Sequence, residues 1–156
     1  MKALIVYDSF FGNTEKIALG ISKALGPKVK AKALKVGNVK MEQLIGLDLL
    51  IVGSPTRAFR PTKAITDLLK SLPSNGLKGV KVAAFDTRIS PDKIKSRLLT
   101  RLVKWLGYAA EPIDSRLRKK GGSPVLPPEG FFVDDSKGPL TKGELERAAG
   151  WARQCI

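Results

Sequence analysis

A polar loop at residues 8–14, Asp-Ser-Phe-Phe-Gly-Asn-Thr, follows an apolar run and precedes a helical pattern. The first backbone N–H groups of a helix have no partner within the helix, and together with the helix dipole they attract anions. Gly12 lets the backbone approach a ligand closely, and Ser9, Asn13 and Thr14 add short polar side chains. An anion would be held by neutral donors, because the loop contains no Lys or Arg. The same residue types also cap helices, so the loop alone leaves phosphate binding and capping as alternatives.

Other common reactive sites are missing from the sequence. It contains neither a G-x-G-x-x-G dinucleotide fingerprint nor a G-K-[ST] triphosphate loop. It has no His and a single Cys, so we expect no internal disulfide, structural zinc site or iron–sulfur cluster. That residue, Cys155, lies beside the C-terminus and is predicted to be a frayed terminal thiol. No nucleophile–base pair is recognisable, which favours chemistry supplied by a cofactor.

Five strand patterns alternate with helical patterns along the chain, which predicts an α/β domain with right-handed crossovers and a mostly parallel sheet. Apolar runs without alternation predict strands buried on both faces, whereas one alternating run is typical of an edge strand. The predicted strands are residues 3–7, 29–36 (the edge type), 47–52, 80–85 and 130–133. The predicted helices are residues 14–25, 62–72, 91–106, a segment that begins near Pro112, and 142–153.

Residues 7–18, Tyr-Asp-Ser-Phe-Phe-Gly-Asn-Thr-Glu-Lys-Ile-Ala, resemble the flavodoxin signature, whose core is Ser/Thr-x-x-Gly-x-Thr after the first strand. Residues 53–56, Gly-Ser-Pro-Thr, resemble the second flavin loop of that family. Residues 128–133, 138–140 and 143–146 resemble the tails of small bacterial and archaeal flavodoxin-domain proteins. The resemblance implies one domain over residues 1–156, a three-layer flavodoxin-like sandwich with a five-stranded parallel sheet and helices on both faces.

The resemblance also implies an FMN cofactor held by three loops. The first loop would bind the phosphate through its hydroxyls and backbone N–H groups: Ser9, Phe10, Phe11, Gly12, Asn13 and Thr14. The second would contact the ribityl chain and line one face of the ring: Ser54, Pro55, Thr56, Arg57, Ala58 and Phe59. The third would lie at the other side of the ring or at its pyrimidine edge: Asp86, Thr87 and Arg88. The sequence departs from the family where Phe11 replaces a common Thr and where the third loop lacks an aromatic residue.

An FMN-binding electron-transfer protein is the function that the resemblance favours, with no catalytic residue and no metal expected. One alternative is a flavodoxin-like NAD(P)H quinone reductase, an FMN-dependent oxidoreductase, although this length leaves no room for a second nucleotide domain. The other alternative is a non-catalytic basic binding module that has lost the flavin.

The charge balance predicts an anionic partner. The chain has 28 Lys and Arg against 14 Asp and Glu, for a net charge of +14. We expect an acidic redox partner; an anionic membrane surface and a nucleic acid are alternatives, the latter without a recognised motif. The basic amphipathic segment 91–106, with Trp105 near its end, either docks such a partner or packs on the domain.

Two further expectations follow from charge and hydropathy. Arg57, Arg60 and Arg88 lie in the presumed ring loops, where a cation would favour the reduced, anionic flavin. They could equally point into solvent, where salt screens them. The apolar N-terminal run is too short for a signal peptide and no stretch is long enough to span a bilayer, so a cytoplasmic protein is expected.

Overall fold

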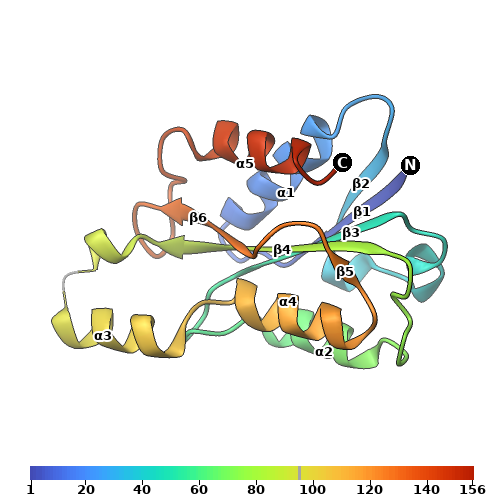
Figure 1. Cartoon of the computed structure of the whole chain (residues 1–156). Coiled ribbons are helices and arrows are strands. Elements are labelled where there is room, and N and C mark those ends of the chain that lie inside the picture. Colours follow the sequence, from blue (N-terminus) through green and yellow to red (C-terminus); the bar gives the residue numbers. More distant parts are fainter. Residues whose placement is uncertain (95) are drawn as a thin grey trace.

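The strands of this computed structural model, which describes residues 1–94 and 96–156, form one parallel sheet (Figure 1). The described strands are β1 Lys2–Tyr7, β2 Lys30–Lys35, β3 Leu49–Pro55, β4 Lys81–Ile89, β5 Ser123–Pro124 and β6 Glu129–Val133. The sheet order is β2-β1-β3-β4-β5, and β6 also pairs with β4. The predicted α/β class with a parallel sheet is confirmed.

The fifth strand of the prediction is divided in two, because β5 and β6 pair with successive parts of β4. Ser123 pairs with Lys81, whereas Glu129 pairs with Phe85, so the register shifts by two residues between the two strands. The intervening segment contains the pair Pro127-Pro128, which has no N–H to donate to a ladder. Only the apolar second half was recognisable in the sequence, because β5 has no strand pattern of its own.

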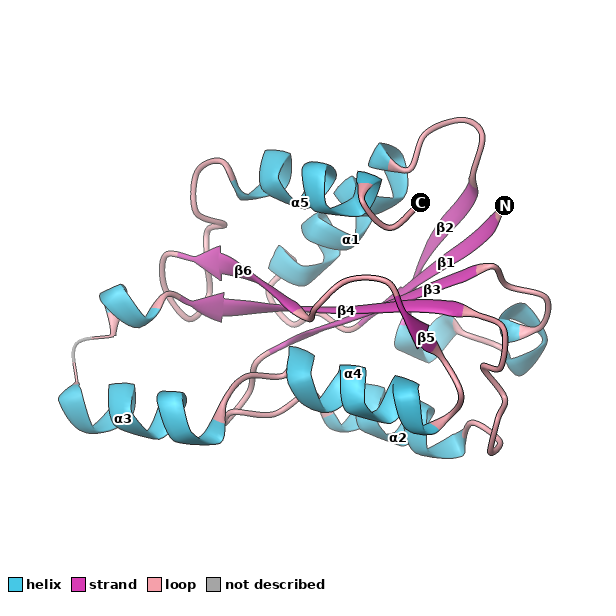
Figure 2. Ribbon diagram, viewed as in Figure 1, coloured by secondary structure: helices cyan, strands magenta, loops and turns pink. Residues whose placement is uncertain are grey.

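Helices cover both faces of the sheet (Figure 2). The α-helices of the described residues are α1 Asn13–Ala24, α2 Lys63–Ser71, α3 Arg97–Leu106, α4 Ala110–Lys119 and α5 Glu144–Arg153. Three short 3₁₀ helices, which the sequence did not indicate, are η1 Val36–Asn38, η2 Met41–Leu44 and η3 Pro91–Lys93. Helices α1 and α5 pack on one face, and α2 and α4 pack on the other. Within the described residues, every helix is too short or too polar to span a lipid bilayer.

The uninterrupted apolar runs fill two hydrophobic cores, because consecutive side chains of a strand point to opposite faces. In β1, Ile5 packs with α1 and α5, whereas Leu4 and Val6 pack with α2 and α4. On the first face, the rings of Phe85, Phe131 and Trp151 meet edge to face. Both layers are therefore specified by the same runs that identify the strands.

The predicted helix over residues 91–106 is shorter in the structure. A 3₁₀ turn occupies its first residues, and α3 begins after Ser96, whose Oγ accepts a hydrogen bond of 3.2 Å from the N–H of Leu99. Of the residues in α3, Val103 alone is buried, so the apolar stripe is largely unpacked. The following helix, α4, begins at Ala110, two residues before Pro112, near which the sequence predicts its start.

The prediction of a frayed Cys155 is wrong. The side chain is 2 % exposed and packs into the core between the sheet and α1 and α5. Burial raises the pKa of its thiol to about 11. Cys155 therefore completes a core instead of extending into solvent.

Glu144, at the start of α5, fixes the edge strand β6. Its Oε2 accepts a hydrogen bond of 2.7 Å from the N–H of Phe132, and the Arg147 guanidinium binds both of its carboxylate oxygens. Arg147 also donates to the carbonyl of Gly130. Burial by itself raises the pKa of Glu144, but the hydrogen bonds from Arg147 and Phe132 outweigh it and lower the pKa overall.

We therefore expect Glu144→Gln to destabilise the fold by about 1–3 kcal/mol at neutral pH, because a charge-assisted bond becomes a neutral one. A pKa lowered by folding stabilises the protein above the unfolded-state pKa, and this stabilisation is lost on acidification below about pH 4. The difference between the two proteins should therefore shrink in acid. Urea unfolding at several pH values measures it, with Glu146→Gln, an exposed site on the same helix, as the control. If the difference in unfolding free energy between the two proteins does not depend on pH, the ionised Glu144 carboxylate is not the source of the stabilisation.

Candidate functional site

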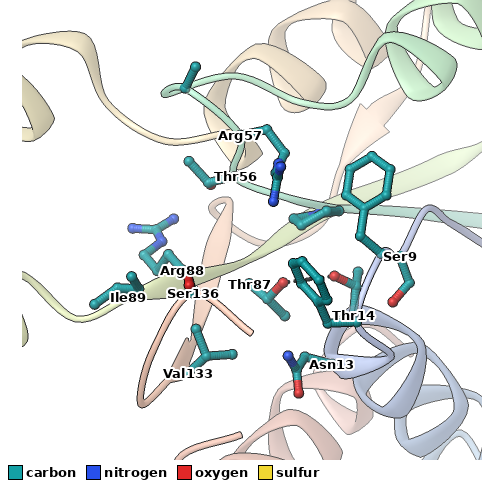
Figure 3. A pocket seen from close by; sticks show the side chains of 14 residues that line it. Ser9, Asn13, Thr14, Thr56, Arg57, Thr87, Arg88, Ile89, Val133 and Ser136 are labelled. Carbon is teal, nitrogen blue, oxygen red and sulfur yellow. Dashed lines mark hydrogen bonds between the residues drawn. The ribbon is translucent and has the colours of Figure 1, made fainter. Parts of the chain in front are cut away.

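Residues at the carboxyl edge of the sheet enclose a pocket of about 340 Å³ (Figure 3). The loops after β1 and β3 form two of its walls, and the segment after β6 forms another. The residues predicted as the third loop, 86–88, are instead the last part of strand β4, which continues to Ile89 because it pairs there with β6. Ligands of open α/β sheets bind at this edge. The lining residues are Ser9, Phe10, Phe11, Asn13, Thr14, Pro55, Thr56, Arg57, Ala58, Thr87, Arg88, Ile89, Val133 and Ser136.

Four of the residues predicted for the site do not line the pocket. Gly12 contributes backbone geometry only. Ser54 and Asp86 are both fully buried, and each bonds to the backbone at the start of a helix. Phe59 lines a neighbouring pocket of about 320 Å³, whose other walls include residues of α3. All the other predicted site residues come together around the pocket.

The sequence analysis missed three lining residues, Ile89, Val133 and Ser136. Ile89 and Val133 are the last residues of β4 and β6, so the longer extent of β4 is the signal that could have identified Ile89. Ser136 lies in the loop after β6, where no motif distinguishes it. Its position depends on how that loop folds back toward α1, where Asn13 Nδ2 donates to the carbonyl of Lys137 at 3.2 Å.

The loop before α1 leaves several backbone N–H groups open. Within residues 1–94 and 96–156, no acceptor meets the N–H groups of Phe10, Phe11, Asn13, Thr14 and Glu15. The N-cap is Gly12, whose φ of 86° is a left-handed conformation that glycine adopts without strain. Its N–H donates to Ser9 Oγ at 3.0 Å, and no side chain caps the helix. The capping alternative therefore does not describe this loop.

The helices α2 and α3 provide the contrast, because each has an ordinary side-chain cap. Thr62 accepts from the N–H of Ile65, and Ser96 accepts from the N–H of Leu99. The polar residues before α1 instead surround the open N–H groups. An N-terminus of this kind favours a bound anion through both its donors and the helix dipole.

Two hydroxyls connect the first loop to the end of β4. Thr14 Oγ1 and Thr87 Oγ1 lie 2.7 Å apart in a hydrogen bond, drawn as a dashed line in Figure 3, and both residues are buried. One hydrogen bond uses one of the two hydroxyl protons, so the pair keeps a second proton for a ligand. Ser9 Oγ accepts from Gly12 and likewise keeps its own proton.

Arg88 is neutralised by Asp86. Its Nε and Nη2 donate to the two Asp86 oxygens at 2.6 and 2.7 Å, and its guanidinium lies 3.6 Å from the centre of the Tyr108 ring. Asp86 Oδ2 also accepts from the N–H of Ala110, the first residue of α4. Burial raises the pKa of Asp86, while the Arg88 guanidinium and the Ala110 N–H oppose the rise. The expected free cation at the third loop is therefore half of a buried ion pair.

Arg57 has a different environment. Its guanidinium lies 5.0 Å from the Phe10 ring centre and 5.9 Å from that of Phe11, a cation–π arrangement across the pocket mouth. The residue is exposed and has no carboxylate partner among the described residues. It opens a tight turn in which Ala58 and Phe59 have φ of 47° and 67°. Such values cost about 1–2 kcal/mol for a residue with a Cβ, so the turn holds stored strain beside the pocket.

The second loop depends on close packing under Gly53. A Cβ at this position would lie 2.0 Å from the Phe85 ring, so the strand accepts only glycine there. Beyond it, the buried Ser54 Oγ accepts from the N–H of Thr62 at 2.9 Å and ties the loop to the start of α2. Thr56 Oγ1 accepts from the N–H of Ala109 at 3.1 Å. The second loop is thereby anchored on both sides of the residues that line the pocket.

The donor set of the pocket fits a phosphate-bearing ligand. Open N–H groups and hydroxyls line the pocket, the exposed Arg57 and the Asp86-paired Arg88 also line it, and no carboxylate is among the lining residues described. No cluster of His, Cys, Asp or Glu that could hold a metal occurs within the described part of the chain.

No protein-family model and no curated protein matches the chain. Solved structures do match its fold. Oxidised flavodoxin 1 from Bacillus cereus has a TM-score of 0.76 at 16 % identity, with 99 % of this chain and 97 % of the other covered. A flavodoxin from the domain Archaea has a TM-score of 0.75 at 22 % identity, with 99 % and 96 % covered.

Larger proteins contain the same fold as one part. The rubredoxin oxygen:oxidoreductase of the anaerobe Desulfovibrio gigas has a TM-score of 0.73 at 20 % identity, and the match covers 99 % of this chain but 35 % of that protein. These similarities establish a flavodoxin-like fold, as the residue pattern predicted.

We expect Asp86→Asn to destabilise the protein by about 3–5 kcal/mol, because it leaves the largely buried Arg88 without its charged partner. Thermal and urea unfolding measure the loss. Asp134→Asn is the matched control, since Asp134 pairs with Lys93 at the exposed surface and its loss should change stability little. Equal effects of the two substitutions would show that the buried pair does not anchor α4 and the end of β4.

Proposed function

We propose that the protein binds FMN in the pocket at the carboxyl edge of the sheet and acts as an electron-transfer protein. The observation that carries this proposal is the set of uncapped N–H groups before α1, at the edge of the sheet where a phosphate would lie. The flavodoxin-like fold and the two joined hydroxyls of Thr14 and Thr87 support it.

Each part of the pocket has a task in this proposal. The open N–H groups of residues 10, 11 and 13–15 and the hydroxyls of Ser9 and Thr14 would hold the phosphate. The second loop, kept in place by Ser54 and Thr56, and the end of β4 would border the ring. Bound FMN supplies the redox chemistry, and the residues of the chain orient it and set the electrostatic potential around it.

We further propose an acidic redox partner, supported by the net charge of +14 and by the absence of carboxylates among the lining residues described. An excess of positive charge steers anionic partners and raises their association rate at low salt. Arg57 is the pocket-lining cation that is exposed toward such a partner.

One feature favours the reductase alternative. The neighbouring pocket that contains Phe59 is mostly apolar, and it shares Thr56, Ala58, Arg88 and Ile89 with the proposed FMN pocket. An apolar acceptor such as a quinone would fit that chemistry. Rapid oxidation of NAD(P)H by the FMN-loaded protein in the presence of a naphthoquinone would favour the reductase, and its absence favours the carrier.

Titration of flavin-free protein with FMN and with riboflavin tests the phosphate site. We expect FMN to bind at least about 100-fold more tightly, because hydrogen bonds to a charged group contribute about 1.5–3 kcal/mol each. Thr14→Val should weaken FMN binding about tenfold through the loss of one hydroxyl donor, with little effect on riboflavin. Quenching of flavin fluorescence reports both affinities.

The matched control is Thr66→Val, the same substitution on α2 away from the pocket, which should leave both affinities unchanged. Equal affinities for FMN and riboflavin would contradict a phosphate site in this loop. Failure to bind either flavin would favour the module that has lost the cofactor.

Arg57→Gln should make the reduction potential of the bound FMN more negative, because the lost cation no longer stabilises the anionic reduced form. A tenfold change in a one-electron equilibrium corresponds to about 60 mV, which sets the expected scale. Arg60→Gln is the matched control, since Arg60 closes the same turn without lining the pocket. Potentiometric titration distinguishes them, and equal shifts would mean that both arginines act only as screened surface charges.

A further inference from the structure

Helix α3 exposes most of its apolar side chains to solvent. Trp105 is 82 % exposed and Leu98 is 69 % exposed, and Leu99 and Leu106 also remain exposed. Val103 alone is buried. Burial of apolar side chains is the main favourable contribution to folding, so a helix that leaves these residues in water suggests a partner surface.

The charges on α3 are of one sign. The helix carries Arg97, Arg101 and Lys104 and no acidic residue. Arg101 and Trp105 are one turn apart, so the indole stands at the boundary between the basic side and the exposed leucines. A short helix with basic residues on one side and Trp and Leu on the other is the pattern of helices that lie in a membrane interface.

The position of α3 favours a broad surface over a matching groove. In Figures 1 and 2 it extends past the other helices of its layer, at the end of the sheet where β4 and β6 finish, with no further element outside it. A protruding helix with exposed Trp and Leu side chains can insert them into a lipid headgroup layer, which needs no complementary groove. The indole of Trp105 combines an apolar body with an N–H donor, which suits the boundary between headgroups and acyl chains.

We propose that α3 docks the protein on an anionic lipid surface. Leu98, Trp105 and Leu106 would enter the headgroup boundary, and the basic residues of α3 would contact lipid phosphates. This inference goes beyond the proposed electron transfer and does not depend on bound FMN. Because Leu99 and Val103 also line the pocket next to the proposed FMN pocket, docking would hold that end of the molecule at the lipid surface.

Intrinsic fluorescence with lipid vesicles tests the proposal on the whole flavin-free chain. The chain has two Trp residues, of which Trp151 is buried at 7 % exposure. A change in the emission of a solvent-exposed indole therefore reports Trp105. Vesicles of phosphatidylcholine mixed with phosphatidylglycerol should shift the emission to shorter wavelength, whereas pure phosphatidylcholine should not. The shift should weaken as salt is raised, because basic side chains supply part of the attraction.

Two pairs of variants distinguish binding through α3 from attraction due to the net positive charge of the whole chain. Leu98→Ala should weaken vesicle binding about tenfold, because apolar area no longer leaves water. Its control is Ile45→Ala, at a site 72 % exposed on another part of the surface. Arg101→Gln should weaken binding about fivefold, as expected for one basic residue near an anionic surface. Its control is Arg153→Gln at the end of α5, on the other side of the sheet.

The outcomes are decisive in both directions. Loss of binding in the two α3 variants but not in their controls would support docking through α3. Equal losses in all four variants, or an unchanged emission spectrum with anionic vesicles, would overturn it. Acrylamide quenching of Trp105 provides a further comparison. If an acidic protein protects Trp105 from acrylamide and anionic vesicles do not, docking on lipid is overturned in favour of a protein partner.

Discussion

The buried carboxylate of Asp86 at the end of β4 is the interaction on which this edge of the molecule depends. It pairs with Arg88, and it accepts a hydrogen bond from the first residue of α4. A carboxylate at a helix N-terminus is favoured by the helix dipole, and a buried charge is tolerated because it is paired and hydrogen-bonded. One side chain therefore fixes the end of β4, the start of α4 and the position of Tyr108 under the guanidinium.

The helix N-termini around the pocket differ in how their first N–H groups are capped, and this difference locates the candidate site. Helices α2 and α3 have Thr and Ser caps, and α4 begins against a carboxylate, but α1 begins at Gly12 with its N–H groups open. A side-chain cap at α1 would have contributed about 1 kcal/mol to stability. Helix α1 lacks this stabilisation, and a bound anionic ligand would provide it by accepting hydrogen bonds from the open N–H groups.

A strained turn and an exposed apolar helix face both lie beside the pocket. The turn through Ala58 and Phe59 has two residues at positive φ, and α3 holds its leucines and Trp105 in solvent. Both features are unfavourable for the isolated chain, whereas the two core layers are closely packed. This distribution is expected when ligand and surface contacts, rather than folding, select the residues at one edge.

The sequence by itself determined the layers, the parallel sheet and the first two loops, because period and apolar runs are local signals that each strand and helix carries within its own residues. It also placed the candidate anion-binding loop before α1. Only the tertiary structure decided that this loop is uncapped, that Arg88 is paired while Arg57 is not, and that Cys155 is buried. These properties depend on contacts between residues that are far apart in the sequence, such as the hydrogen bond between Thr14 and Thr87. A local sequence pattern carries no information about such contacts.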